Sequence, residues 1–270
     1  MKIKQALNIA KARLKDDAKY AEFILLEYIK KDKAYLFLHE DDEIDEKIYF
    51  SLINRFISKE PFEYIFKKAS FYGLDFKVKK GVLIPRYDSE ILLNIILKEL
   101  KNNKFKNILE IGFGSGILSI IIAKMTNTHI IACDISKTAL NIAKKNAKIH
   151  KVDHLIDFRL CSFKDIKNIK FDFIFSNPPY IAKDYKIDEW LQKEPKKALF
   201  GGIKGYEILK EIILYAKDQN ALALACEFGY DQLDILDNIL KQNDFSPSFY
   251  KDENGFNRAF MARNIRLFDK

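Results

Sequence analysis

The sequence has few of the residues that mark several classes of protein. Its 270 residues include only 3 cysteines, 6 prolines and 10 glycines. The cysteines, Cys133, Cys161 and Cys226, are far apart and have no Cys-x-x-Cys spacing, which argues against a disulfide framework or a cysteine zinc site. So little proline and glycine, beside 48% hydrophobic residues, excludes a disordered or fibrous chain. The length suits one large domain or two ordinary ones, each with its own core.

Long apolar segments are also missing. No uninterrupted apolar run approaches the length of a membrane span, and residues 1–5 lack the apolar core of a signal peptide. We therefore expect a cytoplasmic protein with no membrane partner. The formal net charge is +8, yet basic and acidic side chains balance over residues 1–75, so the rest of the chain carries the excess. Such an excess raises the question of a nucleic-acid or acidic protein partner.

The hydrophobic pattern changes twice along the chain. The apolar residues of 1–68 have helical spacing, as at Leu7, Ala10 and Leu14, and predict a small helical bundle. In the next helix, Phe23 is expected on the apolar face that packs into the bundle. Residues 69–84 predict a β-hairpin linker that turns at Lys79–Gly81 and continues in an extended run at 82–84. Residues 85–270 predict an α/β domain, because apolar strands alternate with amphipathic helices. The strand candidates are 107–111, 129–133, 156–160, 171–175 and 221–227, followed by an antiparallel pair at 247–251 and 258–262.

A glycine-rich loop follows the first strand of this domain. Residues 108–117 read Ile-Leu-Glu-Ile-Gly-Phe-Gly-Ser-Gly-Ile. Glycine permits positive φ and a close approach of the backbone to a ligand, although an ordinary tight turn between strand and helix has similar needs. The candidate cofactor-binding residues of the loop are Gly112, Phe113, Gly114, Ser115 and Gly116.

Two carboxylates support a cofactor site at this loop. Asp134 ends the next strand, where its oxygens can accept hydrogen bonds from both ribose hydroxyls of an adenosine group; the alternative is an N-cap of the following helix. The dinucleotide fingerprint Gly-x-Gly-x-x-Gly, started at Gly112, needs its third glycine at position 117, where this chain has isoleucine. The loop therefore favours S-adenosylmethionine over a nicotinamide cofactor. Glu110, just before the loop, is a candidate to meet the ammonium group of that cofactor.

The segment Asn177-Pro178-Pro179-Tyr180 follows a later strand of the same sheet. The strand delivers Asn177 to the carboxyl edge, where ligands of open α/β sheets bind. The alternative is a rigid loop without function, since Asn-Pro often starts a turn. The Asn177 side-chain oxygen and the Pro178 carbonyl suit a planar NH₂ group, whose hydrogens they would accept while aiming the nitrogen at a methyl donor. Tyr180 is expected to pack on the substrate, near the sulfonium. No metal is expected.

Six segments then resemble the protein-(glutamine-N5) methyltransferases that modify peptide chain release factors. They are 61–65 (Pro-Phe-Glu-Tyr-Ile), 83–90 (Leu-Ile-Pro-Arg-Tyr-Asp-Ser-Glu), 177–181 (Asn-Pro-Pro-Tyr-Ile), 194–202 (Glu-Pro-Lys-Lys-Ala-Leu-Phe-Gly-Gly), 227–232 (Glu-Phe-Gly-Tyr-Asp-Gln) and 252–258 (Asp-Glu-Asn-Gly-Phe-Asn-Arg). The resemblance implies a class I S-adenosylmethionine-dependent methyltransferase fold, with a seven-stranded, mainly parallel sheet. It further implies that 1–68 recognises the substrate, which is the glutamine of Gly-Gly-Gln in class I release factors.

The resemblance also implies roles for single residues. Asn177, Pro178 and Tyr180 are the catalytic group, and Pro179 joins them in holding the glutamine amide. Asn177 also borders the cofactor, which becomes S-adenosylhomocysteine. The chain departs from the family where an Asp usually precedes an aromatic residue near the adenine: here Ser162, a weaker acceptor, precedes Phe163, which can stack on the base.

Two other functions fit parts of the pattern. Enzymes that methylate adenine N6 or guanine N2 in nucleic acids share Asn-Pro-Pro-Tyr, but those acting on duplexes normally add an element that extracts the base. A non-catalytic binding module would not need Asn177 beside Asp134. We therefore expect a monomeric enzyme with release factors as partners and no stable nucleic-acid partner.

Overall fold

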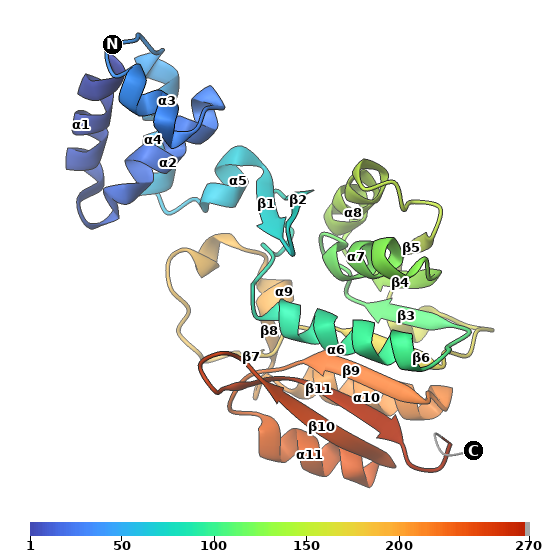
Figure 1. Ribbon diagram of the computed structural model, residues 1–270. Coiled ribbons are helices and arrows are strands. Elements are labelled where there is room, and N and C mark those ends of the chain that lie inside the picture. Colours follow the sequence, from blue (N-terminus) through green and yellow to red (C-terminus); the bar gives the residue numbers. More distant parts are fainter. Residues whose placement is uncertain (268–270) are drawn as a thin grey trace. The chain divides into compact units, whose positions relative to one another are not determined.

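The computed structural model describes residues 1–267, which form two compact units (Figure 1). The first unit comprises Met1–Lys67 together with Asp188–Lys193. The second comprises Lys68–Ile187 and the residues from Glu194 onward. No helix within residues 1–267 is long and apolar enough to cross a membrane.

The first unit is the helical bundle that the sequence predicts. Its helices are α1 (Ile3–Leu14), α2 (Lys19–Ile29), α3 (Lys33–Leu38), α4 (Glu46–Ile57) and α5 (Phe62–Phe66), with a 3₁₀ turn, η1, at Lys15–Asp17. The prediction that Phe23 faces inward was wrong: its side chain is 52% exposed, whereas the adjacent Ile24 is fully buried. The buried residues of α2 are Ala21, Ile24 and Leu25, and the half-buried Leu26 and Ile29 pack against the same core. Asp45 caps α4 by accepting the backbone N–H groups of Lys47 and Ile48.

A β-hairpin opens the second unit. Strand β1 (Lys68–Phe71) pairs antiparallel with β2 (Leu74–Lys77), so the hairpin turns at Tyr72 and Gly73. The predicted turn at Lys79–Gly81 also forms, with the Val82 N–H donating to the Lys79 carbonyl oxygen over 3.1 Å, but it lies after the hairpin. Both turn residues have positive φ, as a two-residue hairpin turn requires, and Gly73 adopts it at no steric cost. The predicted extended run at 82–84 is not a strand.

A seven-stranded sheet forms the centre of the second unit, as predicted. Its strands, in spatial order, are β10 (Phe245–Lys251), β11 (Asn257–Asn264), β9 (Ala223–Glu227), β6 (Phe173–Ser176), β3 (Ile108–Ile111), β4 (Ile130–Asp134) and β5 (Ile156–Leu160). The strands from β9 to β5 are parallel, while β11 runs antiparallel to β9 and to β10.

Helices cover both faces of the sheet because successive strand residues point to opposite sides. Ile108 belongs to a core with α6 (Ser89–Asn102), α7 (Ile117–Thr126) and α8 (Lys137–Ile149). Leu109, the next residue, belongs to a core with α10 (Glu207–Gln219) and α11 (Leu233–Gln242). The central strands β3, β6 and β9 are therefore buried on both faces, which explains their largely apolar sequences, whereas the edge strand β5 alternates buried and exposed residues.

A small two-stranded sheet, which the sequence does not predict, lies along the segment after Asn177. Strand β7 (Ile181–Ala182) pairs with β8 (Phe200–Gly202), which directly follows the short helix α9 (Lys196–Leu199). Two 3₁₀ turns complete the described elements, η2 (Phe163–Asp165) and η3 (Leu191–Lys193).

Candidate active site

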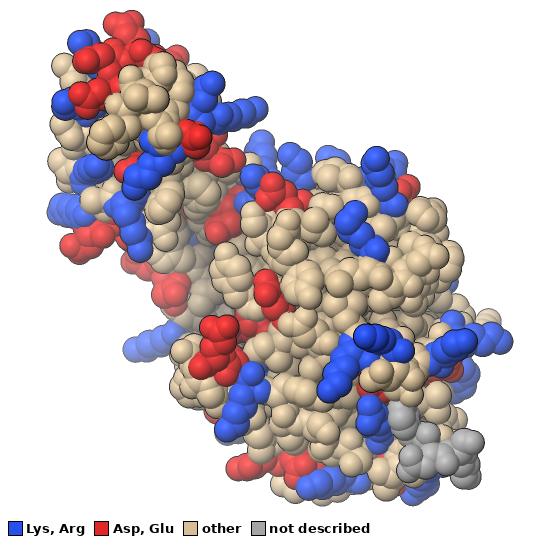
Figure 2. Space-filling model, viewed as in Figure 1, with Lys and Arg blue, Asp and Glu red and all other residues tan. Residues whose placement is uncertain are grey.

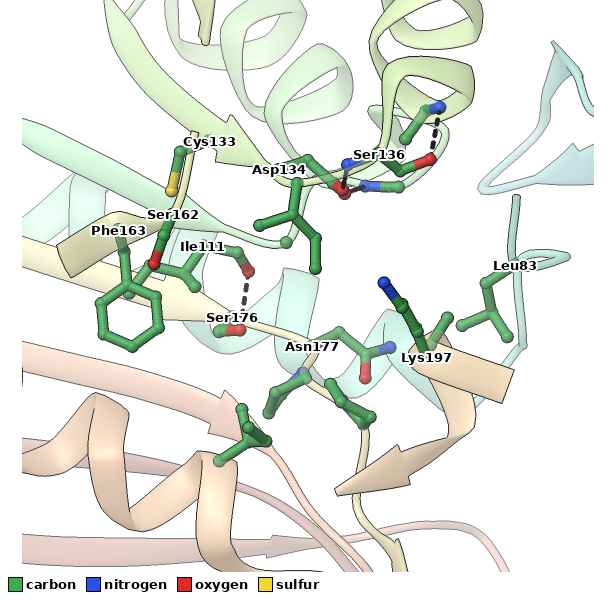
Figure 3. Close-up of a pocket in the computed structure, with 18 of the residues that line it drawn as sticks. Leu83, Ile111, Cys133, Asp134, Ser136, Ser162, Phe163, Ser176, Asn177 and Lys197 are labelled. Carbon is green, nitrogen blue, oxygen red and sulfur yellow. Dashed lines mark hydrogen bonds between the residues drawn. The ribbon is translucent and has the colours of Figure 1, made fainter. Parts of the chain in front are cut away.

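A pocket of about 580 Å³ opens at the carboxyl ends of β3, β4, β5 and β6 (Figure 3). The chain proceeds from β3 through β4 to β5 on one side and then returns to β6 on the other side of β3. Such a reversal of strand order leaves a crevice in which α/β proteins bind ligands. The volume is that of an ordinary small-molecule site. Ser176 closes its floor by donating its hydroxyl to the Ile111 carbonyl oxygen over 2.7 Å.

The glycine loop borders this pocket with two of its three glycines. Gly112 and Gly114 line it, with φ of 75° and 53°, and a Cβ on either would meet no atom within 4 Å. Their bare backbone thus faces open space that a ligand can fill. Gly116 is different, because a Cβ there would lie 3.0 Å from the Ala143 Cβ. Packing of α7 against α8 is therefore sufficient to explain Gly116, and its predicted contact with the cofactor stays a prediction.

Asp134 connects the end of β4 to the glycine loop. One carboxylate oxygen accepts the Gly114 N–H over 3.0 Å and the other accepts the Ser136 N–H over 2.7 Å. Burial raises the pKa of Asp134 above its ordinary value, although these backbone hydrogen bonds act in the opposite direction. The carboxylate lines the pocket and each oxygen keeps a further lone pair. Asp134 can therefore accept hydroxyl groups of a ligand while it holds the loop.

Glu110 lies in a separate recess beside the main pocket. The recess measures about 50 Å³ and shares Gly112, Gly114 and Asn177 with the larger space. Glu110 is almost wholly buried and accepts a hydrogen bond from the Ser119 hydroxyl. Burial raises the pKa of Glu110 to about 7. A buried carboxylate of this kind gains a partner when a ligand ammonium group approaches the recess. Phe113 and Ser115 also line the recess.

Ser162 and Phe163 line the pocket beyond the end of β5. The Ser162 hydroxyl oxygen accepts the Lys164 N–H over 3.3 Å and caps η2, so its own proton remains available to a ligand. The Phe163 ring packs edge-on against Tyr215, with 5.1 Å between ring centroids.

Asn177, Pro178 and Pro179 line the opposite wall of the pocket. The Asn177 Nδ2 donates to the Ser89 hydroxyl oxygen over 2.8 Å, so the amide is held from the side of α6. Tyr180 is committed to contacts within the protein: its hydroxyl donates to Glu227 over 3.0 Å, and its carbonyl oxygen accepts the Gln232 side-chain amide over 2.8 Å. The predicted packing of Tyr180 on a substrate stays a prediction.

Glycines from the loop that contains β8 support this wall. A Cβ on Gly201 would overlap the carbonyl oxygens of Pro179 and Gly205, and one on Gly205 would overlap the Tyr180 carbonyl oxygen. The backbone of β8 therefore touches the backbone of the Asn-Pro-Pro-Tyr segment, at a distance that only glycine allows.

Sequence reasoning missed several residues of the site. Leu83 and Lys197 line the pocket from segments without a predicted role (Figure 3). Ser89 and Glu227 hold Asn177 and Tyr180 from behind. All four lie within the family-like segments, and that was the only available signal. Within residues 1–267 no group of three or more His, Cys, Asp or Glu side chains is arranged to hold a metal ion.

Comparisons with known proteins agree with this architecture. Residues 88–200 match the methyltransferase small domain family, and residues 5–66 match the PrmC N-terminal domain family. Among solved structures, the N-terminal domain of human METTL16 in complex with SAH superposes with a TM-score of 0.52 at 18% identity, over 71% of this chain and 76% of that one. A ribosomal protein L11 methylase from Lactobacillus delbrueckii superposes with a TM-score of 0.52 at 19% identity, over 70% and 84%. These likenesses establish the class I methyltransferase fold.

Curated relatives establish the family. The release factor glutamine methyltransferase of Clostridium botulinum is 36% identical over 90% of this chain and 90% of its own length. The enzyme of the same name from Aquifex aeolicus is 33% identical over 97% of this chain and 96% of its own length. Both the helical unit and the pocket-bearing unit lie within these matches, and so the chain belongs to the release factor glutamine methyltransferase family.

Proposed function

We propose that this protein transfers the methyl group of S-adenosylmethionine to the side-chain amide nitrogen of the glutamine in the Gly-Gly-Gln motif of class I release factors. The observation that carries the proposal is the position of Asn177. Its amide lies at the wall of the pocket and also borders the Glu110 recess, beside the glycine loop. A cofactor that extends from the pocket into the recess would pass Asn177, where a substrate amide could meet it.

The pocket has the donor set that the cofactor needs. Gly112 and Gly114 present bare backbone, Asp134 has lone pairs for ribose hydroxyls, and buried Glu110 suits the ammonium group. Phe163 offers a ring for the adenine, and Ser162 offers a hydroxyl proton to a ring nitrogen. When bound, S-adenosylmethionine supplies an electrophilic methyl group on a cationic sulfur.

The residues after β6 supply orientation. An amide nitrogen is a poor nucleophile because its lone pair is delocalised into the carbonyl group. The Asn177 Oδ1 and the Pro178 carbonyl oxygen would accept its two hydrogens and so aim the nitrogen at the methyl carbon. The new N–C bond forms as the S–C bond breaks, and one amide proton then leaves to water. S-adenosylhomocysteine is the other product. No strong general base is required.

A nucleic-acid substrate remains the alternative that the experiment must test. On the face seen in Figure 2, the Lys and Arg side chains of the second unit are spread among acidic and uncharged residues and form no continuous stripe. A basic stripe is the usual electrostatic footprint of a nucleic-acid site. As part of the same proposal, the enzyme acts as a cytoplasmic monomer without a stable nucleic-acid partner.

The test uses labelled S-adenosylmethionine with a purified release factor, or with DNA or RNA of mixed sequence. Mass spectrometry should find one added methyl group on the Gly-Gly-Gln glutamine. The Asn177→Ala variant should lose methyl transfer while it binds the cofactor nearly as well as the wild type. Label on nucleic acid alone, or unchanged turnover of the variant, would refute the proposal.

A further inference from the structure

A chain of hydrogen bonds runs behind Asn177, away from the pocket. The Asn177 Nδ2 donates to the Ser89 Oγ over 2.8 Å, and the Ser89 hydroxyl donates to a Glu227 carboxylate oxygen over 2.6 Å. Tyr180 donates to the other oxygen of the same carboxylate over 3.0 Å. Ser89 begins α6 and Glu227 ends β9, and each side chain is only 1% exposed. Three separate elements therefore meet at one buried carboxylate.

The donors and acceptors of these hydrogen bonds determine which end of the Asn177 amide faces the pocket. An ionised carboxylate only accepts hydrogen bonds, so the single proton of the Ser89 hydroxyl goes to Glu227. The Ser89 oxygen is then able only to accept from Asn177, and the NH₂ group must face it. The amide carbonyl, Oδ1, consequently faces the other way, and no described residue donates a hydrogen bond to it.

We propose that Glu227 is a positioning residue: through Ser89 it holds the Asn177 amide with its carbonyl oxygen toward the substrate NH₂ group. This inference rests on the proposed function, since a reversed amide would present its own NH₂ to the substrate and repel it. Tyr180 supports the same arrangement by fixing the second carboxylate oxygen of Glu227.

The hydrogen bonds from Asn177 through Ser89 to Glu227 form a relay that depends on the protonation state of Glu227. A protonated Glu227 can donate to the Ser89 oxygen, which frees the Ser89 proton to bond Oδ1 and permits the reversed amide. Burial raises the pKa of Glu227 to about 7; Asp88 raises it further, while Ser89, Tyr180 and Arg258 lower it. Methyl transfer should therefore increase as the pH rises through about 7, because the ionised form holds the productive orientation.

The first experiment compares two changes at the serine. Ser89→Ala removes the relay, and we expect kcat to fall about tenfold, which corresponds to the loss of one hydrogen bond to a charged network. Because Ser89 also lines the Glu110 recess, the Kd for S-adenosylmethionine is measured on the same variants and should change less than kcat. Ser89→Thr keeps a hydroxyl and should restore most of kcat. Ser70→Ala is the matched control, because the Ser70 hydroxyl also donates to a carboxylate, that of Asp75 over 2.7 Å, but on the exposed hairpin. An unchanged kcat in a folded Ser89→Ala protein would overturn the proposal.

The second experiment is independent of activity. The side-chain amide of Asn177, assigned in NMR spectra by its loss in Asn177→Asp, should shift with a midpoint near pH 7. The shift should disappear in Glu227→Gln, which is neutral at every pH, and should persist in Glu110→Gln, which removes the other carboxylate near Asn177 with a pKa raised to about 7. A midpoint that persists in Glu227→Gln contradicts the relay. If the wild type methylates no release factor, the proposed function fails, and the NMR titration still decides whether Glu227 controls Asn177.

Discussion

Three of the glycines with positive φ, Gly73, Gly114 and Gly116, allow a direct test of which residues form the ligand-binding surface of the pocket. Replacement by alanine imposes the cost of the left-handed conformation, roughly 1–2 kcal/mol, at each position. At Gly73 and Gly114 no steric cost adds to this conformational cost, because a Cβ would meet no atom within 4 Å. At Gly116 the Cβ would press on the Ala143 Cβ at 3.0 Å and on the Ile120 Cδ1 at 3.1 Å. Such overpacking adds about 1–3 kcal/mol.

The expected outcomes separate stability from ligand binding. Gly73→Ala and Gly114→Ala should each lower the melting temperature by about 2–4 °C per kcal/mol, and Gly116→Ala should lower it further. Only Gly114→Ala places its methyl group in the pocket, so it should raise the Kd for S-adenosylmethionine at least tenfold, about 1.4 kcal/mol. Gly73→Ala, which lies on the hairpin turn, controls for the backbone cost alone.

Calorimetric titration with S-adenosylmethionine measures the Kd of each variant, and thermal unfolding of the same samples measures its melting temperature. The assignment of Gly114 to the ligand surface fails if Gly114→Ala binds the cofactor as tightly as Gly73→Ala does. The assignment of Gly116 to packing fails if Gly116→Ala loses affinity while its melting temperature matches that of the other two variants.

Three further predictions concern the recess, the supporting loop and the helical unit. Burial raises the pKa of Glu110 to about 7 from an ordinary 4.5, so its contribution to stability is full below about pH 4.5 and is lost as the pH rises through 7; Glu110→Gln should remove this part of the pH dependence of the unfolding free energy. Gly201→Ala should displace the Asn-Pro-Pro-Tyr backbone and lower kcat more than tenfold, with cofactor affinity changed less; equal losses of both would point to a general folding defect. Phe37 and Leu38 are 88% and 80% exposed on α3, and replacing both by serine should raise KM for a release factor but not for a short Gly-Gly-Gln peptide; a peptide KM that rises equally would exclude a docking role.

Much of this protein was predictable from the sequence by itself. The two periodicities, about 3.6 in helices and 2 in strands, depend only on local backbone geometry, and they predicted the helical bundle and all seven strands of the main sheet. The glycine loop, Asp134 and Asn177 were predicted to meet because parallel strands bring their carboxyl ends to one edge, and all three line one pocket. Local rules failed where two turns competed: the hairpin turns at Tyr72 and Gly73, although Lys79–Gly81 is also turn-like.

Tertiary structure decided which side chains stand behind the site. Ser89 is separated from Asn177 by 88 positions and from Glu227 by 138, and no local pattern specifies such a pairing. The contact of Gly201 with the Pro179 carbonyl oxygen is of the same kind. Periodicity specifies the face of an element on which a residue lies, but the partner across that face is chosen only when whole elements pack. Local patterns were therefore sufficient to predict the fold and the edge of the sheet that carries the pocket, whereas the orientation of the Asn177 amide depends on how distant elements pack.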